Sequence, residues 1–349
     1  MSEAKSLDYW SFFAREAKKS GDILYSRIIA GVGGDDALKA MAAKSRPGQP
    51  HANMILGAVN FLLLRGAQHP LRRFYATLGG DADARAEDPF PAFRDFCLAH
   101  GGELEALIAA RVTNTNEVGR TAVLHPGFRA LAAKAGAPLG LIEIGPSAGL
   151  NMIWDRYGVR YLRGEKPDVE IAPDAPLVIE CELRGEQNPP VTPTPAVASR
   201  IGLELNPVDL TRTDDCDWLR ALVWPDRPAR LRRLDTAIDL FQRVRPDIRA
   251  GDALALLPDA IREIPEDRSV CVYHTIVTYQ FSHEMRQALD DILTLAGLRR
   301  PVWRLALEAE AKDSAWRNWL TLSCYQDGAV ESRRLAESHP HGAWIEWLG

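Results

Sequence analysis

Residues 138–157 combine an apolar strand, a tight turn and the start of a helix, and this stretch constrains the fold more than any other. Residues 139–144 are almost continuously apolar, which is typical of a strand covered on both faces in a parallel sheet. Apolar side chains then recur at helical spacing, at Leu150, Ile153, Trp154 and Tyr157. A buried strand that turns directly into a helix predicts an α/β fold.

The turn in this stretch, Gly145-Pro-Ser147-Ala-Gly149, fits two kinds of site. In a nucleotide or S-adenosylmethionine (SAM) site, Glu143 ends the strand and the small residues let a ligand approach the backbone beside the N–H groups of the new helix. In a serine hydrolase, the same G-x-S-x-G pattern makes Ser147 the nucleophile. A tight turn that binds no ligand is the third interpretation.

Composition and charge argue against several functional classes. The 349-residue chain is 46% hydrophobic and 26% charged, as ordinary globular proteins are. Its net charge of −5 gives no reason to expect a nucleic-acid or membrane partner, and the longest apolar run, 54–64, is too short to span a bilayer. The five cysteines are scattered and no secretion signal is visible, so we expect a cytoplasmic protein.

Helical periodicity dominates the chain from Leu7 to Ala135. Helices are predicted over residues 53–64, 69–78, 90–99 and 102–111. This disfavours a hydrolase, which normally has strands and an oxyanion loop before its nucleophile; the only candidate loop, Gly31-Val-Gly-Gly34, lies between helices. We predict an all-helical N-terminal cap region, residues 1–136, followed by a Rossmann-like domain, residues 137–349.

Polar residues close to the predicted strand are candidates for substrate binding. Residues 113–120 form a polar island between apolar helices, and Asn116, Glu117 and Arg120 are its candidate contacts. Capping of the helix that begins near Arg120 is the alternative. Asp155 and Arg156, which follow the glycine-containing turn, are further candidates.

A second strand is predicted within residues 199–210, and it ends in Glu204. An acidic residue at this place accepts hydrogen bonds from ribose hydroxyls in a Rossmann-type site. Glu204 follows Glu143 by 61 residues, whereas the usual gap is about 20. The proline-rich segment 158–198, with one apolar strand at 177–183, explains the excess as an insertion that is either a substrate lid or a decorated loop.

Two helices, 215–222 and 227–244, precede a third acidic position at Asp252. Asp252 either faces the adenine of a ligand or caps the helix that follows it. The β-rich segment 269–277 is typical of a central parallel strand. His274, near its end, is either a catalytic base or a hydrogen-bonded structural residue.

The last part of the chain predicts a helix from Glu284 to Ala296, capped by Gly297. Strand candidates follow at 301–308, 318–325 and 342–348, and their direct succession indicates an antiparallel end to the sheet. His339 and His341 fit a metal pair or a hydrolase histidine, but Pro340 between them indicates a turn, and we predict no metal site.

Several of these stretches resemble a bacterial family catalogued as domain of unknown function 2332. The matching stretches are Thr115-Asn-Glu-Val-Gly-Arg120, Glu143-Ile-Gly-Pro-Ser-Ala-Gly-Leu-Asn151, Trp154-Asp-Arg-Tyr157, Arg200-Ile-Gly-Leu-Glu-Leu-Asn-Pro-Val-Asp209, Trp218-Leu-Arg-Ala-Leu-Val-Trp-Pro225, Gly251-Asp252 and His339-Pro-His-Gly342. The resemblance runs from about residue 50 to the C-terminus. It implies no particular activity.

A looser similarity, to class I SAM-dependent methyltransferases, supplies a chemistry. It rests on Glu143-x-Gly145-x-x-x-Gly149, Glu204 and Asp252, each at the end of a successive predicted strand. It implies a Rossmann-like, mostly parallel sheet with an antiparallel end, and SAM held by Glu143, Gly145, Ser147, Gly149, Glu204 and Asp252. Ser147 stands where a middle glycine is usual, and no acceptor motif such as Asn-Pro-Pro-Tyr follows the fourth strand.

We therefore expect a SAM-dependent methyltransferase that acts on a small molecule, with His274 as its base and with much of the rate arising from positioning. One alternative is a non-catalytic module that binds an adenosyl or nucleotide ligand on the same fold. The other is a serine hydrolase that uses Ser147 with His339 or His341. The methyl acceptor and the oligomeric state are not predicted.

Overall fold

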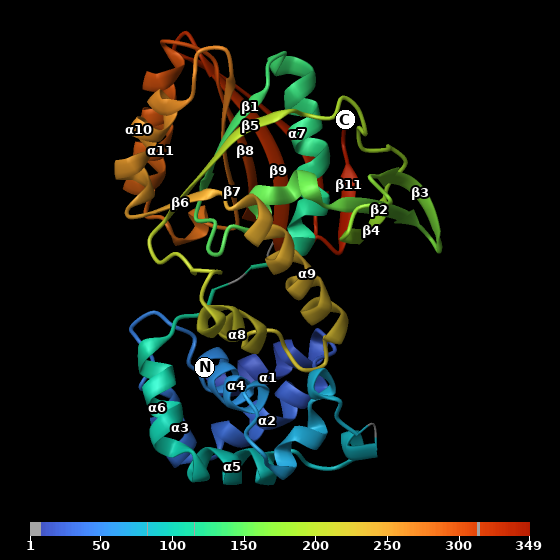
Figure 1. Cartoon of the computed structure of the whole chain (residues 1–349), viewed down its shortest axis with the longest axis vertical. Helices are drawn as coiled ribbons and strands as arrows, with labels where there is room; N and C mark the ends of the chain where they lie inside the picture. The colour runs from blue at the N-terminus through green and yellow to red at the C-terminus, as the bar shows by residue number, and fades with distance from the viewer. Residues whose placement is uncertain (1–7, 82, 115, 313–314) are drawn as a thin grey trace, which may run out of the picture. The chain divides into compact units, whose positions relative to one another are not determined.

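The structure is a computed structural model that describes residues 8–81, 83–114, 116–312 and 315–349. The chain forms two compact units (Figure 1). Residues 1–115 and 210–235 make the first, here called the helical unit, and residues 116–209 and 236–349 make the second, the sheet unit. Residues 116–136, which helical periodicity alone groups with the N-terminal helices, thus belong to the sheet unit, and residues 210–235 belong to the helical unit.

The described part of the helical unit contains α-helices, short 3-10 helices and the loops between them. Its elements are α1 (Tyr9–Lys19), α2 (Ile23–Gly33), α3 (Asp36–Ala42), α4 (His51–Leu64), η1 (Pro70–Phe74), η2 (Ala76–Leu78), η3 (Asp83–Ala86), α5 (Phe90–Ala99), α6 (Gly101–Ala110), α8 (Thr213–Ala221) and the first half of α9 (Pro228–Val244). The helices predicted at 53–64, 90–99 and 102–111 are confirmed. The helix predicted at 69–78 is instead the pair η1 and η2, so the N-terminal region is not purely α-helical.

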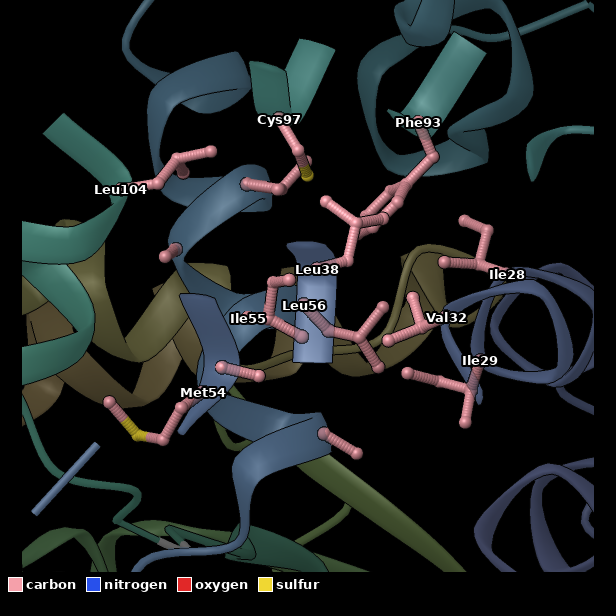
Figure 2. Packing of buried hydrophobic residues seen from close by; sticks show 14 of the residues in the cluster. Ile28, Ile29, Val32, Leu38, Met54, Ile55, Leu56, Phe93, Cys97 and Leu104 are labelled. Carbon is pink, nitrogen blue, oxygen red and sulfur yellow. The ribbon is translucent and has the colours of Figure 1, made fainter. Parts of the chain in front are cut away.

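Helix α4 forms the centre of the helical unit because it is apolar almost all round, and ten of its residues are buried. Figure 2 shows part of the core around it, where Met54, Ile55 and Leu56 lie among side chains from α2, α3, α5 and α6. The buried amide of Asn60 is accommodated because its Nδ2 donates to the carbonyl oxygens of Ala221 at 2.9 Å and Val223 at 3.3 Å. This tethers the end of α8 to the core of the unit.

The sheet unit is a mixed α/β fold built on one 11-stranded sheet. Its elements are η4 (Val118–Arg120), α7 (Thr121–Ala135), β1 (Leu139–Ile144), η5 (Leu150–Arg156), β2 (Gly158–Arg163), β3 (Lys166–Ile171), β4 (Val178–Arg184), β5 (Val197–Glu204), the second half of α9, β6 (Asp247–Ala250), α10 (Ala253–Glu263), β7 (Ser269–Thr275), η6 (Thr278–Gln280), α11 (His283–Gly297), β8 (Val302–Lys312), β9 (Ala315–Gln326), β10 (Ala329–Ser338) and β11 (Trp344–Trp347).

The strand order is β3-β2-β4-β11-β10-β9-β8-β7-β1-β5-β6, and six of the ten described pairings are parallel. Strands β6, β5, β1, β7 and β8 form a continuous parallel block. Strands β8, β9, β10 and β11 then pair antiparallel with one another, as predicted for the strands at the end of the chain. They do not form the edge of the sheet, because β11 pairs in parallel with β4. The mostly parallel sheet with helices is therefore confirmed.

Helices cover both faces of the parallel block (Figure 1). On one face, α10 and α11 pack Leu257 and Leu289 against apolar side chains that include Val270 and Val302. On the other face, α7 packs so closely that a Cβ added at its Gly127 would lie 2.9 Å from Leu305 Cδ1. Burial on both faces explains why β1 and β7 are apolar along nearly their whole length.

The structure corrects three local predictions and adds one strand that was not predicted. The segment 158–198 is neither a lid nor a simple loop, since it supplies β2, β3 and β4 to the main sheet. The helix predicted after Gly149 is a short 3-10 helix, η5, interrupted at Ile153 (φ −108°, ψ 28°). Gly297 is the last residue of α11, and Leu298 takes the cap position; a Cβ at Gly297 would lie 2.7 Å from the carbonyl oxygen of Tyr325. Strand β10 was not predicted, because most of its side chains are exposed and polar.

Within the described residues, none of the helices combines the length and apolarity needed to cross a bilayer.

Candidate functional site

The turn that follows β1 needs its two glycines for conformation and for packing. Gly145 and Gly149 have left-handed φ values of 68° and 78°, and Ser147 between them has φ 58°. A Cβ at Gly145 would lie 2.8 Å from Val277 Cγ2, and one at Gly149 would lie 2.6 Å from Ile248 Cδ1. Both positions therefore select glycine whether or not a ligand approaches.

Glu204 lies at the end of β5, the strand that pairs with β1, and its carboxylate holds this turn in place. Oε2 accepts a hydrogen bond from the backbone N–H of Ser147 at 2.8 Å, and Oε1 accepts one from the N–H of Asn206 at 3.1 Å. The predicted ribose-binding residue and the predicted ligand loop are thus brought together. Each carboxylate oxygen still has a second lone pair that can accept a hydroxyl hydrogen.

The side chain of Asn116, which precedes β1 in the chain, holds the same turn through two further hydrogen bonds. Its Nδ2 donates to Ser147 Oγ at 2.8 Å, and its Oδ1 accepts from the N–H of Ala148 at 3.0 Å. Together with Glu204, it therefore engages two successive backbone N–H groups of the turn. Those groups would otherwise form an anion-binding site of the kind that phosphate-binding loops present.

Glu143 is buried beside this turn, near the end of β1. The hydroxyl of Tyr273 on the adjacent β7 donates to Glu143 Oε2 at 2.8 Å. Burial raises the pKa of Glu143 to about 8, although the Tyr273 hydrogen bond and the charge of Arg120 act in the opposite direction. A carboxyl group with this pKa is largely protonated at neutral pH.

Arg120 and Glu117 link three parts of the sheet unit. Arg120 Nη1 donates to the carbonyl oxygen of Thr275 at 3.1 Å, at the end of β7, and its Nε donates to the carbonyl oxygen of Pro340 at 2.9 Å. The buried Glu117 accepts from the N–H of Gly119 at 3.0 Å, and its other oxygen lies 3.9 Å from His341 Nδ1. Thr115, the first residue of this motif, lies outside the described residues.

His274 is fully buried in a network of polar side chains. Its Nδ1 lies 2.5 Å from Glu308 Oε1, and its Nε2 accepts from Arg304 Nε at 3.0 Å, so Nδ1 carries the proton. Burial lowers the pKa of His274, while the hydrogen bond to Glu308 opposes this change. Both ring nitrogens are therefore engaged within the protein.

The remaining predicted residues lie apart from these contacts. Asp252 is exposed and caps α10, accepting from the N–H of Leu254 at 2.8 Å. Asp155 accepts from Arg200 Nη2 at 2.6 Å, and Arg200 Nε also donates to the carbonyl oxygen of Met152 at 2.9 Å. This pair joins η5 to β5. The side chain of Arg156 is 56% exposed and lies 3.7 Å from Asp155.

Comparison with known proteins identifies the family. Residues 8–347 match the model of a family described as an uncharacterized protein conserved in bacteria (DUF2332). The chain belongs to the DUF2332 family. No curated protein and no solved structure matches the chain. The DUF2332 match contains all of the contacts described above, from Asn116 to His341.

Sequence reasoning missed three polar residues of this DUF2332 chain. Tyr273 and Arg304 lie inside predicted strands, and Glu308 lies at the end of one. Their only signal is that they are polar groups within predicted strands, and for Tyr273 that burial on both faces of its strand was expected. Among the described residues, no group of three or more histidine, cysteine, aspartate or glutamate side chains is arranged to hold a metal ion.

Proposed function

We propose that the sheet unit binds SAM and that the protein is a methyltransferase acting on a small molecule. The observation that carries this proposal is the way in which Glu204 and Asn116 engage the N–H groups of Ser147 and Ala148. A dinucleotide site uses such N–H groups for its pyrophosphate, and a carboxylate beside them repels phosphate. An adenosyl ligand without phosphate does not need them, and its ribose hydroxyls are donors that suit Glu204.

The order of the parallel strands also supports the proposal. Numbered along the chain, the parallel block reads third, second, first, fourth, fifth, the order of a Rossmann-like sheet. In such sheets the ligand binds at the carboxyl ends of the strands, where the order reverses. In this chain that point lies between β1 and β7, where Glu143 and Tyr273 meet.

Three acidic residues then have distinct roles. Glu204, already oriented by two backbone N–H groups, would accept hydrogen bonds from the ribose. Asp252 would accept from the adenine amino group with Oδ2, since its capping hydrogen bond uses only Oδ1. Glu143, held by Tyr273, would keep a protonated carboxyl group beneath the turn.

SAM, when bound, supplies an electrophilic methyl group. The contribution of this chain would be to hold donor and acceptor in line and to exclude water, which accounts for much of the rate in reactions of this type. The predicted role of His274 as the base stays a prediction. That role requires the imidazole to release either Glu308 or Arg304.

One observation favours the serine hydrolase alternative. Ser147 has a left-handed φ of 58°, and a strained backbone at the serine is a feature of nucleophile turns. However, its N–H donates to Glu204 and its Oγ accepts from Asn116. A fluorophosphonate probe distinguishes the hydrolase from the methyltransferase. Labelling of Ser147 in the folded protein supports a serine hydrolase, and absence of labelling excludes a serine hydrolase.

Transfer of a radiolabelled methyl group from SAM to a panel of small alcohols, phenols, amines, thiols and carboxylates tests the enzyme proposal. We expect S-adenosylhomocysteine to form with at least one acceptor class and its formation to be lost in Glu204→Ala. If S-adenosylhomocysteine binds but no acceptor is methylated, the non-catalytic binding module becomes the better description.

A further inference from the structure

A cavity of about 640 Å³ opens in the sheet unit, away from the carboxyl ends of the parallel strands. It is lined by Ser269, the first residue of β7, and by Pro301, which immediately precedes β8. These residues mark the amino ends of strands that run parallel to β1. The cavity is therefore distinct from the candidate site around Glu143 and Glu204, and its volume is in the range of small-molecule sites.

The cavity arises because α7 is shorter than the sheet face on which it packs, so one end of that face is left uncovered. Gly127 of α7 packs against Leu305 and Leu320, but the helix stops at Ala135. The same face continues along β8 and β9 with Trp303, Leu322 and Cys324, which form the apolar floor of the cavity. Trp303 and Cys324 are direct cross-strand partners, so they form one continuous surface.

Positive charge dominates the walls of the cavity. Lys134, Arg268, Arg300 and Arg333 line it, together with two acidic side chains, Glu266 and Glu331, and the last residue, Gly349. Arg300 is fixed in place, since Nη1 and Nη2 donate to the carbonyl oxygens of Pro265 and Ile264, each at 2.8 Å. Glu266 lies 3.6 Å from Arg300 but its side chain is 85% exposed, so it neutralises that charge weakly.

We propose that this cavity binds a small anionic ligand with a flat apolar body. The body would lie on Trp303, Leu322 and Cys324, while its carboxylate, sulfonate or phosphate group would face Lys134, Arg268 and Arg333. Arginine and lysine form charge-assisted hydrogen bonds with such groups, and an aromatic floor favours a planar body. This proposal is independent of the proposed methyltransferase activity.

Anilinonaphthalenesulfonate, which has an aromatic body and one sulfonate, is a suitable probe. We expect it to bind at one equivalent per chain. Its affinity should fall by roughly tenfold or more in the double variant R268Q/R333Q, because two charge-assisted contacts are lost. The control R249Q/R262Q removes two arginines of the same unit, paired with Glu263 and Asp259, and should bind normally. Circular dichroism and the unfolding midpoint verify that each variant is folded.

Cys324 locates the bound probe. It is partly accessible, whereas the other four cysteines are buried. The probe should slow iodoacetamide alkylation of Cys324, measured by mass spectrometry, in the native protein and the control but much less in R268Q/R333Q. Neutral phenylnaphthylamine should protect Cys324 equally in all three proteins. The proposal is overturned if saturating anilinonaphthalenesulfonate leaves the alkylation rate unchanged, or if the double variant binds as tightly as the native protein.

Discussion

The backbone N–H of Ser147 donates to Glu204 Oε2 at 2.8 Å, so the carboxylate that ends one strand holds the turn that follows its neighbour. The contact joins residues 57 positions apart, and it exists because β1 and β5 pair in parallel with Ile144 opposite Leu203. The contact fixes the glycine-containing turn to the neighbouring strand, and it orients the carboxylate that would bind a ribose.

Removing this carboxylate should loosen the turn. In Glu204→Ala, the N–H groups of Ser147 and Asn206 lose their acceptor, so their amide hydrogen exchange should accelerate. The free energy of unfolding should fall by about 2 kcal/mol, the scale of hydrogen bonds to a charged group. Glu180→Ala, which removes a carboxylate that is 60% exposed on β4, is the control and should leave exchange at Ser147 unchanged. Unchanged exchange in Glu204→Ala would contradict the proposed anchor.

Asn116 should contribute to the same turn independently. Asn116→Ala removes the bonds to Ser147 Oγ and to the N–H of Ala148, so we expect a loss of about 2 kcal/mol in urea unfolding. The matched control is Asn188→Ala, since Asn188 is exposed and accepts one hydrogen bond from Arg163. Its expected change is much smaller. Equal losses in the two variants would show that the Asn116 contacts are not formed in solution.

The raised pKa of Glu143 predicts that the free energy of unfolding depends on pH. Burial raises its pKa in the folded protein to about 8 from an ordinary 4.5, so the folded state keeps a proton that the unfolded state loses between these values. The contribution of Glu143 to the free energy of unfolding is therefore complete below pH 4.5 and is lost as the pH rises to about 8.

Glu143→Gln isolates this effect because it keeps an acceptor for Tyr273 but does not titrate. Relative to the native protein, the variant should gain stability as the pH rises through this window, by at most about 1.4 kcal/mol per pH unit. Denaturant unfolding at several pH values measures the difference. A difference that stays constant with pH would mean that the carboxyl group titrates normally in the folded state.

Substitution of Gly145 or Gly149 in the turn should be destabilising. Comparison with Gly164 separates the cost of a left-handed backbone from the cost of steric overlap. At Gly164, φ is 73° and an added Cβ would have nothing within 4 Å, so Gly164→Ala should cost only the left-handed conformation, about 1–2 kcal/mol. At Gly149, φ is 78° and the Cβ would also meet Ile248 and Phe241. We expect Gly149→Ala to lose a further 1–3 kcal/mol, roughly, from overpacking. Similar losses at both positions would refute tight packing at Gly149.

The buried parallel strands were predictable because short, continuous apolar runs bounded by turn residues are typical of strands covered on both faces. Strands β1, β5 and β7, the acid at the end of β5 and the cap at Asp252 follow from local patterns. Strand β10 was missed because most of its residues are exposed and several are charged. Its sequence therefore lacks the alternation of apolar and polar residues that predicts a strand, and it reads like a loop. The position of β4 beside β11 was also hidden, since these two strands pair although more than a hundred residues separate them in the chain. Strand β2 joins the sheet through its pairing with β4.

The site shows the same division between local and long-range information. Glycines at 145 and 149 could be recognised from their spacing, but the partners of Asn116 and His274 could not. Asn116 reaches Ser147 only because the segment before α7 lies at the carboxyl end of β1. Glu308 reaches His274 because β8 pairs in parallel with β7, with His274 opposite Ala306. Neither relationship leaves a pattern in a single sequence.

Calorimetric titration with S-adenosylhomocysteine tests the central claim most directly, because it requires no knowledge of the methyl acceptor. We predict one binding site per chain, an affinity at least about tenfold weaker in Glu204→Ala through loss of the ribose contacts, and an unchanged affinity in Glu180→Ala. Absence of any binding heat with the native protein at millimolar ligand, or equal affinity in Glu204→Ala, would contradict an adenosyl site at the end of β5.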